Sequence, residues 1–133
     1  MISSETSIVV RYAETDMMGI VYHANYLPWL EMGRTQLLKE RGFPYTELEA
    51  QGLFLPVIEI NVKYRRPAKY DDTIVVRTVM QEKPFVKIRL EYEVLKEGEA
   101  IATGHSVHAF MNSDGQAIKA PRPFLQALDS EFD

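Results

Sequence analysis

The chain changes its hydrophobic period between a helical first half and a strand-rich second half. In the first half, apolar side chains from Leu27 to Leu38 recur near every third or fourth residue, which is the spacing of a helix face. Asn25 is a favourable N-cap, and Gly42 follows basic residues at a typical helix end. We therefore predict a long, largely buried helix between these two residues. A strand over residues 7–12 and a loop over residues 13–23 are predicted to precede it.

In the second half, apolar and polar residues alternate, as they do in strands with one buried face. The alternation is most regular from Ile58 to Tyr64, so one face of this strand is predicted to be buried. The strand over residues 100–112 is apolar or small on both faces, which predicts a central or interface position. The full set of predicted strands after the helix covers residues 58–64, 73–81, 86–94 and 100–112, and short helices are predicted over residues 44–51 and 121–128.

The order of these elements predicts an α+β fold in one domain, residues 1–133. A curved antiparallel sheet of about five strands, wrapped around one long central helix, satisfies the pattern. One helix covers only part of one sheet face, so apolar surface is left over. We therefore expect a homo-oligomer, a dimer or a dimer of dimers.

Composition narrows the classes of protein and of site. The chain has 133 residues and no cysteine, which excludes disulfides, thiolate metal sites and cysteine nucleophiles. Its 15 basic and 19 acidic residues give a net charge of −4, which argues against nucleic-acid binding. No apolar run approaches the length of about 20 residues needed for a membrane span, and the start does not resemble a signal peptide. We expect a cytoplasmic protein.

Candidate chemistry gathers between the first strand and the long helix. Asp16 lies in a loop before the helix, whose first N–H groups are unpaired and carry partial positive charge. Gly19 permits a tight turn or a close approach to a ligand. A carboxylate that faces N–H donors suits acyl transfer. The residues alone leave a simpler interpretation open, in which Asp16 is a turn residue and Asn25 only a cap.

Residues 10–43 closely resemble the signature of the 4-hydroxybenzoyl-CoA thioesterase-like acyl-CoA thioesterases, which have the hotdog fold. In that signature an aspartate is followed by a glycine, two apolar residues and an Asn-Tyr pair. The matching positions are Asp16, Gly19, Ile20, Val21, Tyr22, His23, Asn25 and Tyr26. The order of the later predicted strands also matches the hotdog layout.

The resemblance implies a hydrolase that cleaves acyl-CoA to a free acid and CoA. Asp16 would activate water as general base, or attack the thioester carbonyl and form a mixed anhydride. The backbone N–H of His23 would polarise that carbonyl. The remaining signature residues would shape the substrate pocket, and Asn25 would also hold the loop against the helix: Gly19, Tyr22, Asn25 and Tyr26. No cofactor is expected, because CoA is part of the substrate.

Six basic residues are candidates for the CoA phosphates, since arginine and lysine bind phosphate. The alternative is that they form a solvated strand face. Four of them fall within seven positions, and two lie on a later strand: Lys63, Arg65, Arg66 and Lys69, then Lys87 and Arg89.

Other candidates are set aside on their spacing. Glu31 is a rival catalytic carboxylate, but it lies three residues before Arg34, which favours an ion pair along the helix. His105 and His108 would face opposite sides of a strand, so no metal site is expected.

Two other functions stay open at this stage. A hotdog hydratase or dehydratase would act on the acyl chain of a thioester, and it would pair a histidine with a carboxylate. A non-catalytic acyl-CoA-binding module would bind the thioester without releasing thiol.

Overall fold

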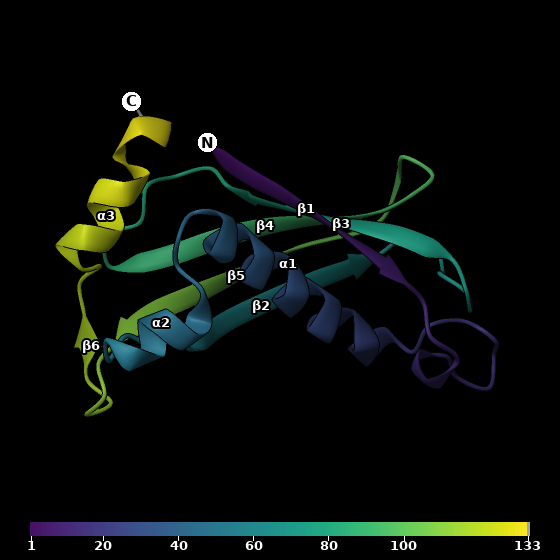
Figure 1. Ribbon diagram of the computed structural model, residues 1–133. Helices are drawn as coiled ribbons and strands as arrows, with labels where there is room; N and C mark the ends of the chain where they lie inside the picture. Colours follow the sequence, from purple (N-terminus) through teal and green to yellow (C-terminus); the bar gives the residue numbers. More distant parts are fainter. Residues whose placement is uncertain (133) are drawn as a thin grey trace.

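The computed structural model describes residues 1–132. Its six strands form one antiparallel sheet in the order β1-β3-β4-β5-β2, and β6 pairs with the last residues of β5 (Figure 1). The strands are β1 (Ile2–Val9), β2 (Val57–Tyr64), β3 (Thr73–Met80), β4 (Lys87–Lys96), β5 (Glu99–Met111) and β6 (Ala117–Ile118).

The long predicted helix is α1 (Tyr26–Glu40), and it lies across one face of the sheet (Figure 1). A 3-10 turn, η2 (His23–Asn25), runs directly into it. Trp29, Leu30, Leu37 and Leu38 are buried between α1 and the sheet. The predicted arrangement, a sheet of about five main strands on one central helix, is confirmed.

Close packing fixes the position of α1 over β3. Gly33 faces the sheet so tightly that a Cβ atom there would lie 2.4 Å from Thr78 Oγ1 and 2.8 Å from Val76 Cγ1. No larger side chain fits at this point without displacing a strand residue. The helix that leads away from the Asp16 loop is therefore held in one register on the sheet.

The first strand is longer and begins earlier than the sequence predicts. The apolar pattern predicts residues 7–12, whereas β1 starts at Ile2 and its pairing with β3 reaches Met80. The prediction misses this half because a serine, Ser4, occupies an inward position where the apolar pattern would have an apolar residue. Ser4 is buried, and its hydroxyl donates to the Glu40 carboxylate of α1. Residues 12–14 form a 3-10 turn, η1 (Tyr12–Glu14), rather than strand and loop.

β2 is an edge strand, and its alternation does not produce a buried face within one chain. Ile58 remains 50% exposed and Ile60 38% exposed, so the prediction of burial is wrong for the single chain. β5 lies between β4 and β2, which confirms its predicted central position. The uncovered apolar face of β2 is the surplus surface expected from the sequence.

The two predicted short helices are present as α2 (Tyr45–Ala50) and α3 (Arg122–Leu128), and a last 3-10 turn, η3 (Asp129–Glu131), follows α3. Within residues 1–132, no helix is both long and apolar enough to cross a membrane.

Candidate active site

Asp16 lies in a tight loop that short contacts close at its base. The Asp16 N–H donates to the Ile20 carbonyl (2.8 Å), and residues 15 and 21 form an isolated antiparallel bridge. Gly19 closes the turn with a φ of +79°, a conformation that glycine adopts without strain. Within the loop, Met18 N–H donates to Asp16 Oδ1 (2.9 Å). The carboxylate is thus oriented by the loop and still partly open to solvent.

The helix start supplies N–H groups beside this loop. The His23 N–H donates to no backbone carbonyl of residues 1–132, as expected for the first residue of a helical segment. The predicted side-chain cap by Asn25 is wrong, because η2 places Asn25 in helical conformation and its side chain makes no cap. Instead, Asn25 Nδ2 donates to the Glu14 carbonyl (2.8 Å). This is the loop-to-helix contact that the resemblance implies for Asn25.

A pocket of about 280 Å³ opens between the Asp16 loop, the helix start and the end of β2. It brings together five of the predicted site residues. These are Asp16, His23, Tyr26, Arg65 and Arg66, and Met18, Ile20, Val21, Tyr64 and Pro67 complete the lining. A carboxylate, apolar walls and two cations therefore meet in one cavity beside the helix start, as in a typical ligand site.

Tyr64 is a wall of this pocket that sequence reasoning missed. Its hydroxyl donates to the His23 carbonyl (2.8 Å), and its ring meets Tyr26 edge to face at 5.0 Å. Burial raises the pKa of Tyr64. Tyr22 does not line the pocket but packs against the His23 ring at 4.5 Å. Only the position of β2 beside the helix start brings Tyr64 there, and the alternation pattern does not carry that information.

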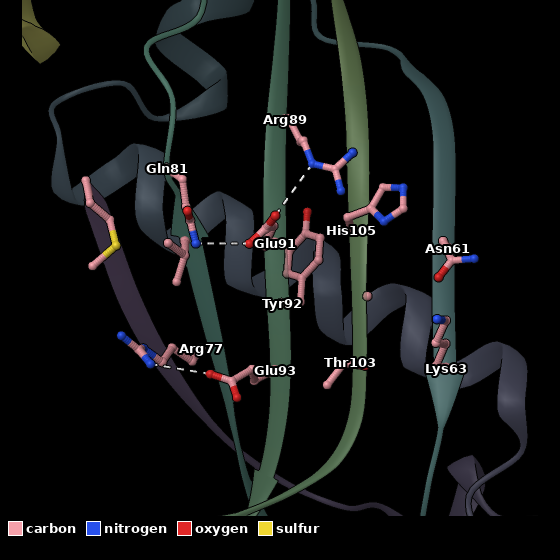
Figure 2. Close-up of a pocket in the computed structure, with 13 residues that line it drawn as sticks. Asn61, Lys63, Arg77, Gln81, Arg89, Glu91, Tyr92, Glu93, Thr103 and His105 are labelled. Atoms are coloured by element: carbon pink, nitrogen blue, oxygen red, sulfur yellow. Dashed lines mark hydrogen bonds and ion pairs between the residues drawn. The ribbon is translucent and has the colours of Figure 1, made fainter. Parts of the chain in front are cut away.

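The six basic candidates are divided between two places. Arg65 and Arg66 line the Asp16 pocket, and Arg66 also pairs with Glu99 (2.8 Å). Lys63 and Arg89 instead line a hollow of about 540 Å³ on the sheet face away from α1 (Figure 2). Neither Lys69 nor Lys87 lines either hollow, and the Lys69 N–H donates to Asp72 Oδ2 (2.8 Å).

This outer-face hollow is the larger of the two, but its charges are largely matched within the sheet. Arg77 pairs with Glu93 (3.3 Å), and Arg89 lies 3.6 Å from Glu91 (Figure 2). None of the signature residues reaches it. The candidate catalytic residues therefore lie at the smaller pocket, beside Asp16.

Glu14 is a second residue that sequence reasoning missed. It lies two residues before Asp16, yet it is only 7% exposed. Its carboxylate accepts from the Arg11 N–H (2.8 Å) and from Trp29 Nε1 (2.8 Å). Burial acts to raise the pKa of Glu14, but these hydrogen bonds outweigh it and lower the pKa below its usual value. Its burial depends on Trp29, whose place is set only by the folded helix.

The expected Glu31–Arg34 ion pair does not form among residues 1–132. Both residues line a separate pocket of about 390 Å³ with Tyr45 and Phe54. Arg34 Nη1 is buried there without a hydrogen-bond partner in the described chain. In the same part of the chain, no group of three or more histidine, aspartate or glutamate residues is placed to hold a metal ion.

Comparison with known proteins adds independent information. Residues 10–128 match the sequence profile of the Thioesterase-like superfamily. A Bacillus subtilis protein named "Putative acyl-CoA thioesterase YneP" is 53% identical over 79 residues, which cover 59% of this chain and 57% of that protein.

Solved structures agree with the architecture. A hypothetical protein, TT1821 from Thermus thermophilus, aligns with a TM-score of 0.91 and 37% identity over 96% of this chain and 98% of that one. A DHNA-CoA thioesterase from Staphylococcus aureus aligns with a TM-score of 0.88 and 34% identity, covering 98% and 95% of the two chains. A 4-hydroxybenzoyl-CoA thioesterase solved with its CoA ester aligns with a TM-score of 0.85 and 20% identity, over 96% of this chain and 99% of that one. This last likeness concerns the fold alone, and it confirms the expected hotdog fold.

Proposed function

Because the chain belongs to the Thioesterase-like superfamily, we propose that it is an acyl-CoA thioesterase that hydrolyses an acyl-CoA to a free acid and CoA. The observation that carries the proposal is the pocket itself. It holds the Asp16 carboxylate, the helix start at His23 and two arginines in one cavity of about 280 Å³. The names of similar proteins, an acyl-CoA thioesterase and a DHNA-CoA thioesterase, support the same reaction class.

In the proposed reaction, the thioester carbonyl oxygen accepts a hydrogen bond from the His23 N–H. Asp16 then takes a proton from water as the water attacks the carbonyl carbon, or attacks that carbon itself. Negative charge develops on the carbonyl oxygen, where the N–H and the partial positive charge of the helix start stabilise it. The C–S bond breaks and CoA leaves as thiolate, which is then protonated to the thiol. Attack by water gives the free acid directly, whereas attack by Asp16 gives a mixed anhydride that a water molecule hydrolyses to the free acid and the Asp16 carboxylate. Both roles of Asp16 require its free carboxylate oxygen to face the pocket.

Two arginines that line the pocket are the proposed contacts to the CoA part of the substrate. Arg65 has no ion-pair partner among residues 1–132, so its guanidinium is available to a phosphate. Arg66 shares its charge with Glu99 (2.8 Å). We assign these two arginines the nearest CoA phosphates. Lys63, Lys69, Lys87 and Arg89 stay predictions from the sequence.

A second copy of the chain is part of the proposal. The apolar face and the unpaired edge of β2 are both open in the single chain. Two β2 strands paired antiparallel would set the Tyr64 end of one beside the Val57 end of the other. The Asp16 pocket would then adjoin the partner's pocket at Arg34. The homodimer expected from the sequence, alone or doubled to a tetramer, is supported by this open edge. The cytoplasmic location stays a prediction from the sequence.

Replacing Asp16 with asparagine tests the proposed function. The asparagine side chain would keep the oxygen that accepts the Met18 N–H, so folding should persist, whereas the carboxylate chemistry is lost. We expect the rate of thiol release to fall at least about a hundredfold. A thiol-reactive dye measures this rate cleanly, because the chain has no cysteine and all detected thiol comes from CoA.

The acyl-CoA panel for this assay should span chain length and aromatic acyl groups, with thermal melting as the control for folding. Thiol release that is unchanged in D16N would contradict the mechanism. Binding of acyl-CoA without thiol release by the unaltered protein would favour a binding module. Hydration of an unsaturated acyl-CoA without thiol release would favour a hydratase.

A further inference from the structure

The buried carboxylate of Glu14 is not accounted for by the proposed reaction. It does not line the Asp16 pocket, and among residues 1–132 its only cation within ion-pair distance is the mostly exposed Arg11, at 3.5 Å. A buried carboxylate is costly unless several hydrogen bonds satisfy it. Its presence two residues before Asp16 therefore calls for a role in this loop.

The side chain of Glu14 connects the loop to α1. One oxygen accepts the Arg11 N–H (2.8 Å), which holds the turn η1 closed. The other accepts from the indole Nε1 of Trp29 (2.8 Å), which is fully buried in the first turns of α1. Hydrogen bonds to an ionised acceptor are about twice as strong as neutral ones. The carboxylate thus ties the start of the loop to the helix.

The backbone of Glu14 ties down the other end of the loop. Its carbonyl accepts from the Tyr22 N–H (2.9 Å) and from Asn25 Nδ2 (2.8 Å). Tyr22 comes directly before His23, so the two ends of the Asp16 loop and the helix start all meet at one residue. Any displacement of Glu14 moves Asp16 relative to the His23 N–H.

We propose that Glu14 is a positioning residue, which sets the Asp16 carboxylate against the helix start through its bond to Trp29. This inference rests on the proposed thioesterase function. Errors of about 1 Å between reacting groups cost on the order of a hundredfold in rate. The loop is fixed by the fold before substrate binds, so the rate constant kcat depends on Glu14 while substrate affinity does not.

The experiment compares Glu14→Gln, Trp29→Phe and the double variant by thiol release. Glutamine keeps the shape of Glu14 but puts an amide donor against an N–H donor, and phenylalanine removes the indole N–H. We expect kcat to fall roughly tenfold to a hundredfold in each single variant, with KM changed less than about threefold. The double variant should be no slower than the worse single variant, because both remove the same bond.

Leu125→Ala is the matched control, since Leu125 is a partly buried residue of α3 that packs on the core and does not line the Asp16 pocket. It should lower the melting temperature and leave kcat unchanged. If E14Q and W29F lose activity only as Leu125→Ala does, or lose none, the positioning role is overturned.

Two further measurements, fluorescence and hydrogen exchange, do not depend on catalytic activity. Trp29 is the only tryptophan of the chain, so its fluorescence reports directly on the bond to Glu14. Its emission should shift in E14Q at neutral pH. Amide hydrogen exchange at Met18 and Gly19, which both donate within the loop, should quicken in E14Q while exchange in β4 and β5 stays unchanged.

If the unaltered protein releases no thiol from any acyl-CoA, the proposed function fails. Emission and loop exchange then still decide whether Glu14 holds the loop. Unchanged emission and unchanged exchange in E14Q would overturn the inference whatever the activity.

Discussion

At the scale of single residues, buried polar groups form a continuous chain across β4 and β5. Tyr92 and Ser106 hydroxyls lie 2.6 Å apart, and Ser106 Oγ lies 2.8 Å from His108 Nε2. His108 Nδ1 donates to the Leu55 carbonyl (3.1 Å), so Nε2 accepts from Ser106 in the neutral imidazole. Burial lowers the pKa of His108 below the usual 6.5, the Leu55 carbonyl opposes this, and nearby Arg34 lowers it further.

The lowered pKa of His108 predicts how the free energy of unfolding depends on pH. Below pH 6.5 the unfolded chain protonates His108 before the folded protein does, so the unfolded state binds more protons. The free energy of unfolding should therefore fall as pH is lowered from about 7 to about 5. Melting curves across this range should show the fall in the unaltered protein and a smaller one in His108→Gln. The control variant His105→Gln, changed on the outer face of the same strand, should show the same fall as the unaltered protein. An equal fall in all three proteins would contradict the assignment of this pH dependence to His108.

At the scale of residues, the signature predicts six site residues. Asp16, His23 and Tyr26 line one pocket, whereas Gly19, Tyr22 and Asn25 do not line it. Glu14 and Tyr64 were missed because their roles depend on Trp29 and on β2, which come next to them only in the folded chain. The Glu31–Arg34 pair was predicted from spacing alone and does not form, because Arg34 turns inward toward Tyr45 and Tyr92.

At the scale of elements, the position of α1 on β3 determines where the helix start meets the Asp16 loop. Gly33 makes this contact, with Thr78 and Val76 directly beneath it. The period of the apolar residues was enough to predict the helix and the strands. It could not predict the contact, nor the first half of β1, where the buried Ser4 interrupts the apolar pattern.

Gly33→Ala tests this contact. Alanine favours a helix over glycine by about 1 kcal/mol, yet the added methyl group meets Thr78 Oγ1 at 2.4 Å. We expect a net loss of roughly 1–3 kcal/mol in the free energy of unfolding, measured by urea denaturation. Adding Thr78→Ala should restore part of the loss. A variant as stable as the unaltered protein would show that α1 can shift on the sheet.

At the scale of the whole molecule, β1 and β2 are the two edge strands of the sheet, and β2 is an edge strand with an apolar face that the described chain leaves uncovered. β2 pairs with β5 alone among the strands of residues 1–132, and Ile58 and Ile60 lie open. The alternation of β2 predicts a buried face, and the single chain leaves that face uncovered. The proposed dimer accounts for the exposed face and for the position of the Asp16 pocket beside it.

A matched pair of variants on β2 tests the dimer. Ile60 and Asn61 are neighbours that face opposite sides of the sheet, and Asn61 lines the outer-face hollow (Figure 2). A carboxylate at position 60 would be buried unpaired in the dimer, at a cost of several kcal/mol. Ile60→Glu should therefore be monomeric by light scattering and lose thiol release, whereas Asn61→Glu should remain a dimer. A dimeric, active Ile60→Glu would place the interface elsewhere.

The pairing of β2 also has a consequence for biosynthesis. β2 ends at residue 64, but its neighbour in the sheet, β5, begins at residue 99. On the ribosome, the wall of the pocket at Tyr64 is therefore made long before the strand that holds it. The Asp16 loop and α1 emerge earlier still, so the pocket can close only after β5 has also left the exit tunnel.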